Sequence, residues 1–178
     1  MTGRETQAFE KPKSEDILDH IRHKKSKDRI VDVEEERILI IIFRLADAFF
    51  GIYGSDAKEV LEVKKITAVP GSPDFIVGIV NVRGDVESVI DLNRFLQLPP
   101  EQESAKVMVI IAQNGGVRSG MRVATIEDVV EIPKSSVRSA ISTLGENIRH
   151  YVIGEMLHNG KNVTMLDVGR IFEKIAAE

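Results

Sequence analysis

The strongest constraint on the fold is an internal duplication, because the second half of the chain repeats the pattern of the first. Residues 38–63 align with 107–132 without a gap, and residues 75–96 align in the same way with 151–172. The matched positions include turn residues: Gly51 with Gly120, Gly78 with Gly154, Gly84 with Gly160, and Asp91 with Asp167. The change of offset places a longer connection in the second copy, around 135–147. The sequence therefore predicts two equivalent structural units.

Each copy consists of short apolar runs separated by polar or glycine-bearing turns. The first copy opens with the run 38–43, and its stretch 69–92 is typical of a strand, a polar turn and a second strand. Valine and isoleucine dominate these runs, and β-branched side chains favour pleated sheet. We expect roughly five short strands and one short helix per copy, closed into small barrels at about 38–98 and about 105–172.

Two aspartates at equivalent positions, Asp91 and Asp167, precede the short helical segments at 93–96 and 170–176. A pair of carboxylates could act as general acid and base if both entered one cleft. Their equivalent places in the two copies instead predict two separate helix N-caps, each satisfying backbone N–H groups of its own helix.

Composition excludes several classes of function. The net charge is −4 and the pI is about 5.7, so the chain lacks the basic surface that nucleic-acid binding requires. Cysteine is absent, which excludes disulfides, thiolate nucleophiles and cysteine metal ligands. No apolar run approaches the ~20 residues of a membrane helix, and no signal peptide is evident. We therefore expect a cytoplasmic protein that does not insert directly into the membrane.

A charged N-terminal extension, residues 1–35, precedes the expected folded region at 36–175. Ser14 could cap a short amphipathic helix at 15–21, and the alternative is a solvated, partly disordered tail. His20 and His23 have a spacing that could suit a metal ion, but no third ligand accompanies them. We expect them to be surface residues.

No motif for catalysis or cofactor binding is found. The turn at 114–116 lacks the helix and the lysine of a phosphate-binding loop, and His158 lies in a His-Asn-Gly-Lys segment typical of a type I′ hairpin turn. We expect no enzyme activity, no metal and no cofactor. A small-molecule receptor or enzyme that uses a cleft between the barrels stays open as an alternative.

One feature of the first copy is not explained by the duplication. Asn81 and Arg83 lie in its central turn, whereas the second copy has Leu157 and Asn159 at these positions. Arg83 could be solvated or paired with Glu87, or it could lie at a partner surface, where a planar guanidinium can bind carboxylates or carbonyls in pairs.

The motifs of this stretch resemble the CheW family of bacterial chemotaxis coupling proteins. The resemblance rests on Val69-Pro-x-x-Pro73, on Phe75-Ile-x-Gly-Ile-x-Asn-x-Arg-Gly84 and on Val89-Ile-Asp-Leu92, and it extends over about 36–175. It implies two five-stranded SH3-like barrels side by side, in a mainly β protein with short helices.

The resemblance also implies a non-catalytic adaptor that couples methyl-accepting chemoreceptor tips to the regulatory domain of a CheA-type histidine kinase, at receptor arrays. In the family, barrel ends pair with the kinase and a groove between the barrels takes the receptor tip. The residues that correspond to partner-binding positions are Val60, Glu62, Asn81, Arg83 and Gly84. Departures at Ser88, Ala124 and 53–56 leave open a divergent chemosensory or surface-motility pathway.

Overall fold

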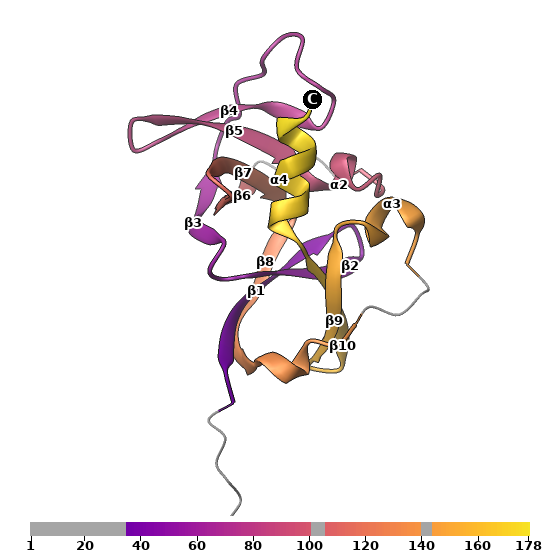
Figure 1. The fold of residues 1–178 in the computed structure, drawn as a ribbon. Coiled ribbons are helices and arrows are strands. Elements are labelled where there is room, and N and C mark those ends of the chain that lie inside the picture. Colours follow the sequence, from indigo (N-terminus) through magenta and orange to yellow (C-terminus); the bar gives the residue numbers. More distant parts are fainter. Residues whose placement is uncertain (1–34, 101–105, 140–143) are drawn as a thin grey trace, which may run out of the picture. The chain divides into compact units, whose positions relative to one another are not determined.

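Figure 1 shows the fold as a computed structural model, which describes residues 35–100, 106–139 and 144–178. The first copy forms β1 (Arg37–Leu45), β2 (Ala48–Tyr53), β3 (Ala57–Val63), β4 (Ile76–Val82), β5 (Asp85–Asp91) and α2 (Leu92–Phe95). The second copy forms β6 (Val107–Asn114), β7 (Val117–Val123), β8 (Thr125–Pro133), the 3-10 turn η1 (Lys134–Ser136), α3 (Glu146–Arg149), β9 (Val152–His158), β10 (Lys161–Leu166) and α4 (Val168–Ala176). The mainly β fold with five strands per copy is confirmed.

The strands are divided between two sheets in a way that the repeat did not predict. The first sheet has the order β8-β1-β2-β10-β9, and the second has the order β3-β6-β7-β5-β4 (Figure 1). Each sheet thus combines the first two strands of one copy with the last three of the other. The predicted barrels at about 38–98 and about 105–172 are therefore wrong in their boundaries, although each sheet is five-stranded and curled like a half-barrel.

The repeat could not reveal this exchange, because pairing within a copy or between copies buries equivalent side chains. β1 pairs with β8 so that Ile41 lies opposite Val129, and β6 pairs with β3 so that Ile110 lies opposite Val60. The alignment of the two copies superimposes these two registers. Because backbone hydrogen bonds are the same for either connection, side-chain pattern alone does not choose between them.

Burial on both faces explains why β1 and β6 are continuous apolar runs. On β1, Ile40 and Ile42 enter the core of the first sheet. Ile41 and Phe43 enter a second core, which both sheets share with the helices α2 and α4. The same alternation holds on β6, where Val109 lies in the core of the second sheet. The shared core holds the two sheets together.

Two repeated glycines are required where the segments that precede β4 and β9 form isolated bridges with these strands. An isolated bridge joins Thr67 to β4, and an equivalent bridge joins Arg138 to β9. A Cβ at Gly78 would lie 2.2 Å from the carbonyl oxygen of Thr67, and a Cβ at Gly154 would lie 2.4 Å from that of Arg138. Only glycine permits these backbone approaches.

The predicted helix caps are confirmed. Oδ1 of Asp91 accepts a hydrogen bond from the backbone N–H of Arg94 at 3.2 Å, and Oδ1 of Asp167 accepts one from Arg170 at 3.1 Å. The turns at 115–116 and 159–160 also form as predicted, with positive φ at each position. The predicted helix at 15–21 lies outside the described residues.

Candidate partner-binding surface

The five residues singled out by the resemblance all lie in the second sheet, on β3 and on the β4–β5 hairpin (Figure 1). Val60 and Glu62 belong to β3, Asn81 belongs to β4, and Arg83 and Gly84 form the turn of the hairpin. In sequence the two groups are well separated. The curl of the sheet and one ion pair decide which of them meet.

The hairpin turn has a backbone that favours other residues than arginine. Oδ1 of Asn81 accepts a hydrogen bond from the N–H of Gly84 at 3.0 Å, which fixes the turn. Arg83 has φ +54° and Gly84 has φ +100°, the positive values of a type I′ turn. A positive φ is costly for most residues with a Cβ and is tolerated best by asparagine and aspartate. The repeat has Asn159 here, at φ +48°, so the backbone does not account for Arg83.

The side chain of Arg83 reaches from the hairpin tip to β3. Its Nη2 lies 2.7 Å from Oε1 of Glu59, and the Arg83 side chain is nevertheless 81% exposed. Pairing with Glu87, one alternative from the sequence, does not occur. Glu87 is buried and pairs instead with Nε of Arg118 at 2.8 Å. Arg83 is thus anchored at one edge of its guanidinium and open to solvent elsewhere.

Glu59 was missed as a candidate, although the duplication contained a signal for it. The alignment places Glu59 over Asp128 of β8, so both edge strands carry an acid at the same position. Asp128 Oδ2 lies 2.8 Å from Nε2 of His158, in the β9–β10 hairpin. The hydrogen bond with His158, aided by one from the Val129 N–H, lowers the pKa of Asp128 below its ordinary value. In both sheets an acid therefore ties the hairpin tip to the edge strand.

Glu62 and Asn81 meet at an open hollow of about 540 Å³ between β3 and β4. Lys64 and Lys65 line it on the β3 side, and Val86, which lies opposite Asn81 in the hairpin, is 64% exposed. The hollow thus presents an amide, charges of both signs and an uncovered apolar side chain next to the ion pair of the hairpin tip.

Val60 does not line this hollow, although the alternation of β3 places it on the same face of the strand as Glu62. Its neighbours Leu61 and Val63 pack on the core of the second sheet, whereas Val60 lies opposite Ile110 of the shared core. Val60 is 39% exposed. In the first sheet, Leu39 of β1 and Val129 of β8 are also exposed on the face whose neighbouring residues enter the shared core. We call Leu39, Val60 and Val129 the apolar margin.

Within the described residues, the acid–base and metal-ligand candidates that the sequence raised are not brought together in one site. Asp91 ends β5 of the second sheet, Asp167 follows β10 of the first sheet, and each caps its own helix. Within the described ranges no group of three or more His, Asp or Glu is placed to hold a metal ion. His20 and His23 lie outside these ranges. Where the chain is described, none of its helices has the length and apolar character needed to cross a membrane.

Comparisons with known proteins agree with the fold and the motifs. The probable chemotaxis protein CheW of Rhizobium etli is 23% identical over 139 residues, which are 78% of this chain and 90% of that protein. The chemotaxis protein CheW of Bacillus subtilis is 24% identical over 139 residues, with 78% and 89% covered. The crystal structure of the scaffolding protein TtCheW from Thermoanaerobacter tengcongensis matches with a TM-score of 0.69 and 27% identity, covering 78% of this chain and 94% of that one. A family model for the CheW-like domain matches residues 39–176, and the chain therefore belongs to the CheW-like domain family.

Proposed function

We propose that this chain, a chemotaxis coupling scaffold, links chemoreceptor tips to the regulatory domain of a CheA-type histidine kinase without catalysis of its own. Family membership and relatives named as chemotaxis proteins support the pathway, and a solved neighbour titled a scaffolding protein supports the mode of action. The protein works in the cytoplasm and is recruited to receptor arrays by its partners.

The observation that carries the proposal is the placement of Arg83. The backbone of its turn favours asparagine, its ion pair with Glu59 leaves most of the side chain in solvent, and the duplicated hairpin has no arginine. A residue that the fold does not require, at a conformation that disfavours it, is best explained by binding. An exposed guanidinium can form paired hydrogen bonds with carboxylates or carbonyls of a partner.

Arg83, Asn81, Gly84 and Glu62 form one partner surface around the hairpin tip and its hollow, and Glu59 orients the arginine. The apolar margin provides a second surface, on which the apolar side of a receptor helix packs. Exposed valine and leucine side chains bordering a core suit a helix that lays its apolar face into a groove. Two separate surfaces are what a bridging scaffold needs.

The experiment is co-elution of the full chain with the kinase regulatory domain and with a receptor-tip fragment. We expect Arg83→Glu to weaken binding of at least one partner about tenfold or more, as for an interface hot spot. Arg83→Asn, which inserts the residue of the duplicate turn, should also weaken binding but leave the free energy of unfolding unchanged within about 0.5 kcal/mol.

The matched control is Arg37→Glu, which breaks the exposed ion pair of Arg37 with Glu131 (3.2 Å) in the first sheet. This variant should bind both partners like the unaltered chain. If Arg83→Glu and Arg37→Glu behave alike in a folded protein, or if neither partner binds at all, the proposal is refuted. A loss of thermal stability in Arg83→Asn would mean that the arginine serves the fold.

A further inference from the structure

A second hollow of the second sheet, of about 440 Å³, is bordered by positively charged side chains. It lies between the segment joining β3 to β4, helix α2 and strand β7, next to the hollow that contains Asn81. The cations that line it are Lys64, Lys65, Arg94 and Arg122. This concentration of positive charge contrasts with a chain whose net charge is −4.

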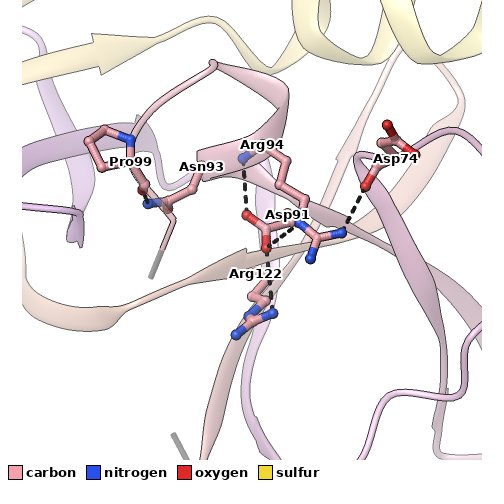
Figure 2. Close-up of polar contacts among 6 residues, drawn as sticks. All are labelled: Asp74, Asp91, Asn93, Arg94, Pro99 and Arg122. Atoms are coloured by element: carbon pink, nitrogen blue, oxygen red, sulfur yellow. Dashed lines mark hydrogen bonds and ion pairs between the residues drawn. The ribbon is translucent and has the colours of Figure 1, made fainter. Parts of the chain in front are cut away.

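Two of the cations, Arg94 and Arg122, are held in place by one buried carboxylate. Figure 2 shows the carboxylate of Asp91 between Arg94 and Arg122, with distances of 3.8 Å to Nε of Arg94 and 3.4 Å to Nη1 of Arg122. Nη1 of Arg94 also donates to the backbone carbonyl of Asp74 at 3.2 Å (Figure 2). Asp91 is buried, so this carboxylate fixes both guanidinium groups but is not itself presented to solvent.

The other two cations belong to the segment that follows β3. Lys64 and Lys65 are exposed, and within the described part of the chain neither forms an ion pair or a side-chain hydrogen bond. Asp74 is the acidic residue that lines the hollow. Four lining cations against Asp74 and the buried Asp91 leave an excess of positive charge at the surface.

Apolar side chains form a further part of the lining, together with the polar Ser72. The apolar side chains come from the β3–β4 segment, β4 and β6, and they are Ile66, Val69, Ile76, Val77 and Val107. Val69 is 40% exposed. The hollow therefore combines an apolar floor with a basic border, and its cations come from the β3–β4 segment, α2 and β7.

The duplication shows that the fold does not require this charge. Under the alignment Arg122 corresponds to Tyr53, and the same offset continued two residues past the aligned segment places Pro133 at Lys64 and Lys134 at Lys65. Nζ of Lys134 is paired with Glu36 at 2.8 Å, an interaction that raises the pKa of Lys134. The equivalent surface of the first sheet thus lacks two of the four cations, and a third is paired.

We propose that this basic hollow binds an acidic, partly apolar segment of a partner protein. Carboxylates of the segment pair with Lys64, Lys65 and the two positioned arginines, while an apolar side chain covers the floor. The apolar side chains of the lining favour such a segment over inorganic phosphate, which has no apolar group to cover them. The site adjoins the hollow that contains Asn81 and shares Lys64 and Lys65 with it, but it extends to Arg94 and Arg122, and Arg83 does not line it.

The test uses the full chain and a fluorescein-labelled ten-residue peptide of Glu, Asp and Leu, with fluorescence anisotropy as the readout. A second peptide with Gln and Asn in place of the acids is the neutral probe. We expect the acidic peptide to bind and the neutral one to bind at least about tenfold more weakly. Because the contacts are exposed, a rise in salt concentration of about tenfold, from ~50 mM to ~500 mM, should weaken binding strongly.

The double variant Lys64→Glu/Lys65→Glu should reduce affinity for the acidic peptide about tenfold or more. Two controls should stay within about twofold: Lys134→Glu, at the repeat position of Lys65, and Arg83→Glu, which tests the other surface. Equal binding of both peptides, or unchanged binding by the double variant, overturns the proposal. Displacement of the peptide by about 10 mM inorganic phosphate would also overturn the proposal, in favour of a site for small anions.

Discussion

The β4–β5 and β9–β10 hairpins have the same construction but carry different tips. Both contain a glycine beneath an isolated bridge, a turn with positive φ and a terminal aspartate that caps a helix. Both tips are tied to an edge strand by an acid, Glu59 in one sheet and Asp128 in the other. The base differs, however: Arg83 in one and His158 in the other.

The comparison separates what the fold needs from what one surface adds. Features present in both hairpins are structural, since the same half-barrel geometry requires them twice. Features present in one only, such as Arg83 and the cations Lys64 and Arg122, are free of that requirement. The most informative experiments therefore change both members of an equivalent pair and compare the two effects.

The largest effect should come from the glycines beneath the bridges. Gly78→Ala and Gly154→Ala each force a Cβ into a backbone carbonyl, at 2.2 Å and 2.4 Å, so the crossing segment must move away. We expect each to lower the free energy of unfolding by about 3 kcal/mol, measured by urea titration. Gly78→Ala should be the worse because its φ is +144°.

Gly169→Ala is the control for these variants. Its new Cβ would meet side-chain atoms of Asn114 and Asp167 at 3.1 Å, and alanine favours the helix in which it lies. Its effect should stay below about 1 kcal/mol. If only one of the two bridge glycines proves sensitive, the hairpins are not equivalent in the way that we describe.

The helix caps should show an intermediate and unequal effect. Asp91→Ala removes the cap of α2 and leaves Arg122 without its carboxylate, whereas Asp167→Ala removes a cap at a more exposed place. We expect a loss of about 2 kcal/mol for Asp91→Ala and about 1 kcal/mol for Asp167→Ala, measured by thermal unfolding. Equal losses would show that Arg122 contributes nothing to the difference.

The smallest effect concerns pH and the tip of the β9–β10 hairpin. The pKa of Asp128 is lowered in the folded protein, first by the hydrogen bond with His158. The unfolded chain therefore binds more protons in the acid range. This contribution to stability is complete above the ordinary aspartate value of about 4 and disappears as the pH falls through the folded pKa.

Asp128→Asn should accordingly flatten the loss of stability between about pH 5 and pH 2. Chemical unfolding at a series of pH values measures this slope. Asp47→Asn, in the turn after β1, is the control and should leave the slope as it is. A steeper acid slope in Asp128→Asn would mean that the carboxyl group destabilises the folded hairpin.

The local structure was predictable because it depends on neighbouring residues. Apolar runs became strands, Asp91 and Asp167 became N-caps, and the His-Asn-Gly-Lys segment became a turn with positive φ. The assignment of strands to sheets was not predictable, since equivalent registers arise from either connection of the copies. The partner of Arg83 was not predictable, because Glu87, which the sequence offered as one alternative, is nearer in sequence, whereas Glu59 is nearer in space.

The sequence by itself determined the duplication, the strands, the caps and the asymmetry that singles out Arg83, since all of these follow from residue type and spacing. Only the tertiary structure decided that β1 and β2 join the sheet of the other copy and that Glu59 meets Arg83. It also decided that Lys64, Lys65, Arg94 and Arg122 gather around one hollow. The reason is physical: pairing and charge clustering depend on distances between residues far apart in the chain, which the curl and crossing of the sheets set.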